Sequence, residues 1–103
     1  MTERLPVKDP GESVVVLFDF SAETASVSSP SVTSSVRWSL PGDASPSAVL
    51  DGAPSISGSN AAHVLQRVDG GVDLTDYALR CTAMSAEGDV LVVPAVLPVR
   101  LLP

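Results

Sequence analysis

The stretch LTDYALRCTAMSAEG, residues 74–88, decides the fold class because its apolar residues recur at every second position. Successive side chains of a β-strand point to opposite faces of the sheet. One face of this stretch is apolar and is formed by Tyr77, Leu79, Cys81 and Ala83. The opposite face holds Ala78, Arg80, Thr82 and Met84. This alternation predicts a strand buried on one side, joined through the turn SAEGD to a second long strand, VLVVPAVLPVRL, at 90–101.

Cys81 is the single cysteine of the chain, and its position on the apolar face bears on its chemistry. A thiol in apolar surroundings has a raised pKa and is inert, whereas a reactive thiol needs an exposed, cationic neighbourhood. We therefore expect Cys81 to be buried beside Tyr77 and to play a structural role. A lone cysteine also excludes a disulfide within the chain and any metal cluster built from several cysteines.

The composition agrees with an all-β domain. A chain of 103 residues fits one domain, and its core must be built largely from valine, leucine and alanine because only 4% of the residues are aromatic. Valine favours strands, and nine prolines and seven glycines leave little room for a long helix. We expect an extended N-terminal arm over residues 1–12 and a β-sandwich domain over residues 13–103.

The first strand of that domain is predicted in SVVVLFDFS, residues 13–21. Its core face would be formed by Val14, Val16, Phe18 and Phe20, and its other face by Val15, Leu17 and Asp19. Residues 21–35 are rich in serine and threonine, which favours turns. A second strand is expected in VTSSVRWSL, residues 32–40, with Trp38 as a central core anchor and an exposed binding anchor as the alternative.

Turn-forming residues dominate the middle of the chain, from Pro41 to Asn60, where we expect a loop with short strands near residues 48–50 and 55–57. AAHVLQRVDGG, residues 61–71, has one mixed face and is therefore predicted to form an edge strand. Pro94 and Pro98 cannot donate to a ladder, so they predict that the last strand lies at an edge or on a bulge. The resulting spacing, about six to eight strands with frequent turns, is typical of a β-sandwich.

Charge and hydropathy exclude several classes of function. Twelve acidic and six basic residues give a formal net charge of -6, which disfavours binding to a phosphate backbone. No apolar run resembles a signal peptide or a membrane span, so we expect synthesis in the cytoplasm.

Catalytic and metal-binding patterns are weak. His63 is the only histidine and so the only candidate base of a hydrolytic triad, but we expect it to be a partly exposed strand side chain. SGSN at residues 57–60 is typical of a turn and lacks the context of a nucleophile elbow. DGGVDLTD at residues 69–76 resembles calcium-binding loops only in composition. We predict no enzymatic activity, no cofactor and no metal site.

The strand around Tyr77 also resembles a known fold. The order of Leu74, Tyr77, the alternating residues after it, Ser85 and Gly88 is similar to the penultimate strand of fibronectin type III and other immunoglobulin-like sandwiches. In those folds the tyrosine hydroxyl bonds back to the backbone a few residues upstream. The resemblance implies an immunoglobulin-like antiparallel β-sandwich in which Tyr77 takes that role.

The two ends of the chain resemble small phage virion proteins of the fiber-tail adaptor type. The shared order is Lys8-Asp9-Pro10, then Phe18-Asp19-Phe20-Ser21, then Gly70-Gly71, Tyr77, the turn at residues 85–88 and Arg100. The centre of the chain is longer and richer in serine and proline than in those proteins. Phe20 stands where they usually carry tryptophan.

This resemblance implies a non-enzymatic adaptor of a phage tail or neck, located in the virion, that binds other virion proteins and forms a homo-oligomeric ring. Its arm and loop would provide the partner contacts, for which the candidates are Leu5, Lys8, Asp9, Pro10, Asp43, Leu50, Asp51 and Ile56. The alternative is a stand-alone immunoglobulin-like module that binds a protein or a carbohydrate. Exposure of Trp38 would favour this alternative, because sugar binding usually needs an exposed aromatic platform.

Overall fold

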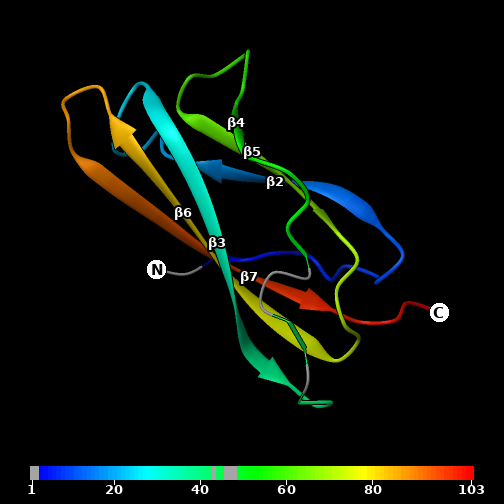
Figure 1. Ribbon diagram of the computed structural model, residues 1–103. Coiled ribbons are helices and arrows are strands. Elements are labelled where there is room, and N and C mark those ends of the chain that lie inside the picture. Colours follow the sequence, from blue (N-terminus) through cyan, green and yellow to red (C-terminus); the bar gives the residue numbers. More distant parts are fainter. Residues whose placement is uncertain (1–2, 43, 46–48) are drawn as a thin grey trace.

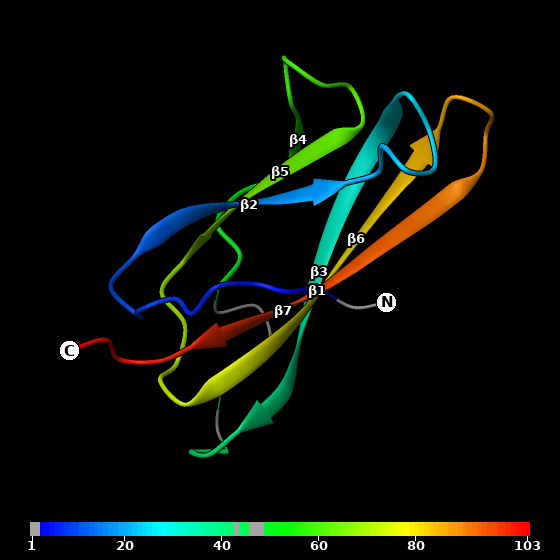
Figure 2. The same cartoon turned by 180° about the vertical axis from the view of Figure 1, so that it is seen from behind.

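The computed structural model describes residues 3–42, 44, 45 and 49–103 and forms two packed β-sheets (Figures 1 and 2). The strands are β1 (Glu3–Arg4), β2 (Ser13–Asp19), β3 (Val27–Ser39), β4 (Ser55–Ile56), β5 (His63–Asp69), β6 (Thr75–Ser85) and β7 (Val90–Val99). One sheet has the order β1-β7-β6-β3 and the other has the order β2-β5-β4. The described residues include no helix. The prediction of an all-β sandwich is therefore confirmed.

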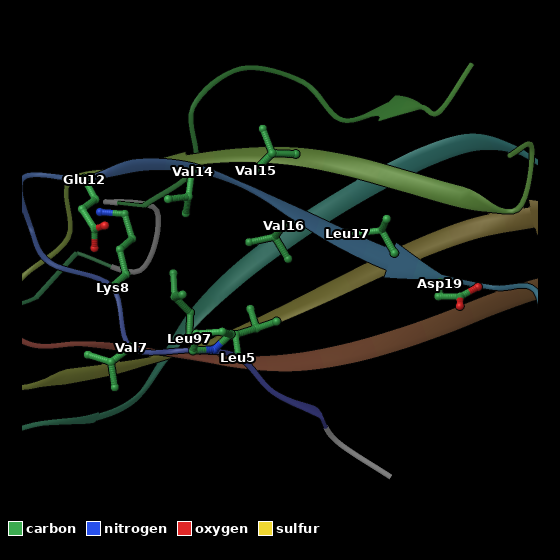
Figure 3. A pocket seen from close by; sticks show the side chains of 11 residues that line it. Leu5, Val7, Lys8, Glu12, Val14, Val15, Val16, Leu17, Asp19 and Leu97 are labelled. Carbon is green, nitrogen blue, oxygen red and sulfur yellow. The ribbon is translucent and has the colours of Figure 1, made fainter. Parts of the chain in front are cut away.

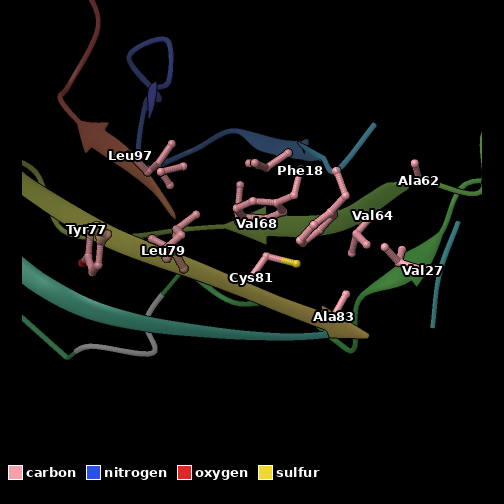
Figure 4. Close-up of a cluster of buried hydrophobic side chains, with 14 of the residues drawn as sticks. Phe18, Val27, Ala62, Val64, Val68, Tyr77, Leu79, Cys81, Ala83 and Leu97 are labelled. Carbon is pink, nitrogen blue, oxygen red and sulfur yellow. The ribbon is translucent and has the colours of Figure 1, made fainter. Parts of the chain in front are cut away.

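The core lies between the two sheets and is built from the alternate residues of their facing sides (Figure 4). From β2 and β5 it receives Val16, Phe18, Val64 and Val68, and from β6 it receives Tyr77, Leu79, Cys81 and Ala83. Full burial of a valine, leucine or phenylalanine side chain contributes about 1.5–3 kcal/mol. The predicted core face of residues 77–83 is confirmed, and so is that of β2 except for Val14, which is 36% exposed.

The hairpin of β6 and β7 is confirmed, but the predicted edge position of β7 holds only for the part of the strand before Ala95. β7 pairs with β6 along its whole length and with β1 at Ala95 and Val96, so its second half lies inside the sheet. The carbonyl oxygens of Val96 and Pro98 accept hydrogen bonds from the N-terminal segment, which shows that even-numbered residues of β7 direct their backbone away from β6. Pro94 and Pro98 share this parity, so neither removes a bond of the β6–β7 ladder.

The strand β5 is also not an edge strand, contrary to the prediction from its mixed face. It lies between β2 and β4, and Leu50 forms an additional bridge to Val68. The mixed face of β5, with His63 and Arg67, is the solvent side of a sheet that has one covered face. Of the short strands expected in the loop, Ser55–Ile56 is confirmed as β4. Of the one expected near residues 48–50, residue 48 lies outside the described part of the chain, and Leu50 forms a single bridge rather than a strand.

Much of the serine-rich stretch at residues 21–35 is strand, so the turn prediction is wrong from Val27 onward. β3 runs to Ser39 and pairs with β6 between two register shifts, one between Ser28 and Ser31 and one between Val36 and Trp38. The long apolar strand β6 supplies a hydrogen-bonding partner for the backbone of β3, which outweighs the turn preference of serine.

The segment predicted as an N-terminal arm runs along β7 in the described residues. Leu5 N–H donates to the Val96 carbonyl at 2.8 Å, Lys8 N–H donates to the Pro98 carbonyl at 2.9 Å, and Arg100 N–H donates to the Lys8 carbonyl at 2.9 Å. This parallel pairing brings the segment beside the open side of β2.

The hydroxyl of Tyr77 accepts a hydrogen bond from the backbone N–H of Val72 at 3.0 Å. The bond runs to the backbone five residues upstream and fixes the turn that enters β6. The same turn contains Gly71 at φ 98°, where an added Cβ would lie 2.9 Å from Val49 Cγ1. A close approach between the turn and the core therefore requires glycine at this position.

Candidate functional site

The edges of the two sheets differ in how well they are protected from pairing with another chain. In the described residues the outermost strands are β1 and β3 in one sheet and β2 and β4 in the other. β1 and β4 have only two residues each, and β3 carries Pro30 and two register shifts. Short length, proline and bulges are the means by which proteins protect sheet edges. These three edges are therefore unfavourable for pairing. The first part of β7 is also unpaired on its outer side in the described residues, but it is short and ends at Pro94.

The edge of β2 lacks all of these protections. β2 pairs with β5 in unbroken register over seven residues, and its sequence SVVVLFD contains no proline or lysine. Phe20 N–H donates to the Ala62 carbonyl at 2.9 Å, so the even-numbered residues direct their backbone toward β5. By the same alternation, the N–H and C=O groups of Val15 and Leu17 point to the open side. β2 therefore offers a regular row of free donors and acceptors.

The side chains of the β2 edge are apolar and exposed. Val15 is 50% exposed, Leu17 is 44% exposed, and Val14 is 36% exposed. A row of exposed valine and leucine on a long edge strand is a feature of surfaces that pair with another chain. This surface, formed by Val14, Val15 and Leu17, is called the β2 edge below.

A groove of about 600 Å³ lies beside the β2 edge, between β2 and the N-terminal segment (Figure 3). Its wall on the segment side is formed by Leu5, Pro6, Val7 and Lys8, and Leu97 of β7 also lines it. Glu12 and Asp19 stand near the two ends of β2. The groove is thus apolar along its length and acidic at both ends, a shape that suits an extended segment with apolar side chains.

Lys8 is buried and engaged within the chain. Its side chain is 2% exposed, and Nζ donates to the Gly70 carbonyl at 2.6 Å and to the Asp9 carbonyl at 2.9 Å. Desolvation lowers the pKa of Lys8, although the carboxylates of Asp69, Glu12 and Asp9 act in the opposite direction. Lys8 therefore fixes the N-terminal segment to the turn after β5, and its ammonium group does not point outward as a contact.

Asp9 joins the two ends of the chain. Oδ1 accepts from Gly11 N–H at 2.7 Å and Oδ2 accepts from Leu102 N–H at 2.8 Å. These hydrogen bonds lower the pKa of Asp9 because they favour the charged carboxylate. Pro10, between Asp9 and Gly11, is partly exposed.

The candidate contact residues predicted from sequence do not form one surface. Leu5 and Lys8 line the groove, but Leu50 and Ile56 lie on the other side of β5, where they pair with Val68 and Val64. The neighbouring loop residue Asp51 is exposed, and its N–H donates to the Arg67 carbonyl at 3.1 Å. The candidate Asp43 lies outside the described residues.

The residues of the β2 edge were not among the predicted contacts. The sequence pattern placed Val15 and Leu17 on the side of β2 away from the core, and this is confirmed by their exposure. The prediction assigned edges to β5 and β7. Nothing in the sequence pattern indicated that β2 would have an open edge.

Trp38 forms a second exposed surface, and its prediction as a core anchor is wrong. The register shift after Val36 places Trp38 opposite Asp76, and its side chain is 47% exposed. The Arg100 guanidinium lies 5.4 Å from the ring centroid and donates to Asp76 Oδ1 at 2.9 Å. Arg4 lies 3.6 Å from the other oxygen of Asp76. The ring is thus held on the outer face by a stacked cation.

Two further arginines line a shallow depression on the same face. Arg37 and Arg80 border it together with small residues of β3, β6 and β7. Among the residues that the structure describes, no carboxylate lies within ion-pair distance of either guanidinium. This surface, defined by Trp38, Arg37, Arg80 and Arg100, is called the arginine face below.

Two places with catalytic potential were named from the sequence, His63 and the SGSN turn. His63 is partly exposed, as predicted, and its Nε2 lies 3.2 Å from Asp19 Oδ1. Hydrogen bonds from Ser21 lower the pKa of Asp19, with a smaller contribution from His63. In the SGSN turn, the hydroxyls of Ser57 and Ser59 bond to each other at 3.0 Å.

Cys81 is fully buried, as predicted. Burial raises the pKa of the thiol to about 11. Within residues 3–42, 44, 45 and 49–103, no group of three or more histidine, cysteine, aspartate or glutamate side chains is placed to hold a metal ion. The same residues contain no helix with the length and apolar character needed to span a membrane.

No protein-family model matches this chain, and no curated protein matches it.

Proposed function

We propose that this protein is a non-enzymatic assembly component that joins protein chains by strand pairing at the β2 edge. The observation that carries the proposal is the contrast among the sheet edges of the described structure. β2 is open along seven residues in regular register and has exposed apolar side chains, whereas β7 is unpaired on its outer side only before Ala95 and carries Pro94 there. Backbone hydrogen bonds to an added strand supply affinity, and the groove lined by Leu5 and Leu97 supplies selectivity for its side chains.

The proposal includes the role that the resemblance implies, an adaptor in the tail or neck of a phage particle. The chain ends support this setting, since the Lys8-Asp9-Pro10 segment is fixed to β7 and to Leu102 and leaves the side of β2 open. A ring of copies would need a second contact besides the β2 edge, for which the arginine face is available.

An immunoglobulin-like arrangement of the sandwich is part of the same proposal. The sheets β2-β5-β4 and β7-β6-β3 correspond in order to the B-E-D and G-F-C strands of such folds. The parallel pairing of β1 with β7 and the hydrogen bond of Tyr77 to Val72 are further points of agreement. In this comparison no strand occupies the position beside β2, which is where an added strand would pair.

The test is the mass of the chain in solution, measured by light scattering over a range of concentrations. We expect the wild-type mass to rise with concentration, and the double variant Val15→Lys/Leu17→Lys to remain a monomer, because lysine on an edge strand opposes pairing. Val90→Lys/Val92→Lys is the matched control, since these valines are 65% and 40% exposed on another strand.

A wild-type chain that stays monomeric at every concentration would contradict the proposal. Equal loss of association in the β2 variant and in the β7 control would contradict the assignment to the β2 edge. Circular dichroism of each variant establishes that the sandwich is folded.

A binding module for a protein or carbohydrate is the second candidate function. It is favoured by the exposure of Trp38 and by the Arg100 guanidinium stacked on its ring. Tryptophan and arginine are enriched at the centres of binding surfaces, and an exposed ring can also stack on a sugar. A monomeric chain that binds a ligand through Trp38 would support this function over assembly.

A further inference from the structure

We propose that the strand added at the β2 edge is β2 of a second copy, paired antiparallel about a twofold axis at Val16. This inference rests on the proposed function and names its partner. It follows from the direction of the free backbone groups, the side chains that meet in each register, and the position of Arg67.

The free backbone groups restrict the possible registers. In an antiparallel pair, a hydrogen-bonded pair exchanges N–H and C=O groups between two directly opposite residues. On β2 the free groups belong to odd-numbered residues such as Val15 and Leu17, so odd residues must face odd residues. An axis at Val16 satisfies this condition, since it places Val15 of one copy opposite Leu17 of the other.

The side chains distinguish this register from its neighbours. With the axis at Val16, the exposed Val15 and Leu17 of both copies form one apolar strip across the joined sheets. With the axis at Val15, Leu17 would face Ser13, and with the axis at Leu17, Val15 would face Asp19. The register at Val16 is therefore the one in which apolar residues face apolar residues.

Charge complementarity identifies a second copy as the partner. Arg67 lies on β5 beside Val15, and its Nη1 is 3.3 Å from Ser13 Oγ. With the axis at Val16, Ser13 of one copy faces Asp19 of the other. The guanidinium of Arg67 is thus directed toward a carboxylate of the second copy, and the twofold axis repeats this pair at the other end. The remaining acidic residue of this segment, Glu12, would face Phe20 and no like charge.

The proposed twofold contact limits assembly through the β2 edge to two copies. A twofold contact uses the same patch on both copies and is complete in the dimer. The joined sheet has the order β4-β5-β2-β2-β5-β4, in which both open edges of β2 are removed. Larger assemblies would then be built from dimers through another surface.

Charge reversal tests the partner and the register together. We expect Asp19→Arg and Arg67→Asp each to weaken self-association by about tenfold or more, because each places like charges opposite one another. The double variant Asp19→Arg/Arg67→Asp restores the pair in reversed form and should associate within about threefold of wild type. Dissociation constants come from sedimentation equilibrium, with circular dichroism as the check on folding.

Glu87→Arg and Asp89→Arg are matched controls, since both residues are exposed and lie in the turn between β6 and β7. These two variants should associate as the wild type does. Loss of association in the controls would show a general charge effect and would overturn the specific pair.

Cross-linking gives an independent measure of the register. In a Cys81→Ala background, chains carrying Val15→Cys are mixed with chains carrying Leu17→Cys and oxidised. Directly opposite residues of a hydrogen-bonded pair have Cα atoms about 5.5 Å apart, within the range of a disulfide. We expect the mixed disulfide to exceed both like disulfides.

The outcomes separate this inference from the proposed function. Association that requires Val15 and Leu17 but shows no charge rescue, or that favours like disulfides, overturns the twofold register and leaves the β2 edge as the assembly surface. A chain that does not associate at any concentration overturns both. Association with rescue and with the mixed disulfide supports both.

Discussion

At the scale of single residues, the polar groups of the interior hold particular segments in place. Lys8 is bonded to two carbonyl oxygens inside the fold, and Asp9 bonds to the backbone of Leu102 at the other end of the chain. A buried polar group costs free energy unless it is hydrogen-bonded, so the two bonds of the buried Lys8 allow the segment to lie beside β7. The N-terminal segment thereby forms one wall of the groove without pairing with β2.

Cys81 provides a prediction at the same scale. Its pKa is raised by burial to about 11, whereas the unfolded thiol ionises near 9.0. The folded state therefore favours the neutral thiol, and its contribution to stability is present below about pH 9 and is lost as the pH rises through 11.

We expect the free energy of unfolding of the wild type to fall between pH 9 and 11 by about 2–3 kcal/mol more than that of Cys81→Ala. Urea denaturation across this pH range measures the difference. Lys8, whose pKa is lowered, has the opposite slope in both proteins and cancels in the comparison. Parallel pH profiles would show that burial of the thiol does not affect its ionisation.

At the scale of the elements, the chain protects its sheet edges unequally. Pro94 and Pro98 occupy positions of β7 whose missing N–H does not affect pairing with β6, and β1 covers the second half of the strand. β3 is irregular at two places, and β4 is very short. β2 keeps the longer regular apolar edge, without proline, and this contrast between elements is the basis of the proposed assembly.

The turn between β5 and β6 provides a prediction for an element. Gly71 and Gly88 both have positive φ, but a Cβ at Gly71 would lie 2.9 Å from Val49, whereas a Cβ at Gly88 would meet nothing within 4 Å. We expect Gly88→Ala to cost about 1 kcal/mol from backbone strain, and Gly71→Ala to cost about 3 kcal/mol because a clash is added.

Urea denaturation of the two alanine variants measures this difference. Similar losses at the two positions would mean that Val49 and Val99 move aside at little cost. In that case the turn would not be held tightly against the core.

At the scale of the whole molecule, the two outer faces of the sandwich differ in charge and in shape. Arg37, Arg80 and Arg100 belong to the arginine face, and Arg4 binds Asp76 beside them. Four of the six basic residues therefore lie together on this side of the molecule. The remaining two are Lys8 and Arg67. A chain with a net charge of -6 thus has a basic surface around Trp38, on the sheet opposite the β2 edge.

Trp38 supports a prediction about the role of this surface. We expect Trp38→Ala to change the free energy of unfolding by no more than about 1 kcal/mol, since the ring is half exposed. Phe20→Ala is the control, because Phe20 is fully buried and its truncation should cost about 3–5 kcal/mol.

The same measurement distinguishes a surface residue from a core anchor. Acrylamide should also quench the fluorescence of Trp38 in the folded protein nearly as well as in the unfolded chain. A large loss of stability in Trp38→Ala, together with fluorescence protected from acrylamide, would show that Trp38 is a core residue. That result would contradict the second candidate function.

The sequence by itself determined the fold class, the hairpin of β6 and β7, and the burial of Cys81 and Tyr77. These properties depend on the alternation of side chains along one strand, which is a local property of the chain. The sequence also placed Val15 and Leu17 on the outer side of β2.

Only the tertiary structure decided which strand keeps an open edge, where Trp38 lies and how the N-terminal segment runs. An edge is a property of strand order, and strand order depends on pairing between residues far apart in the chain, such as Glu3 with Ala95 and Leu50 with Val68. A register shift of one residue then moved Trp38 to the outer face. For this reason the β2 edge could not be recognised from the sequence, although each of its residues could be assigned to a strand.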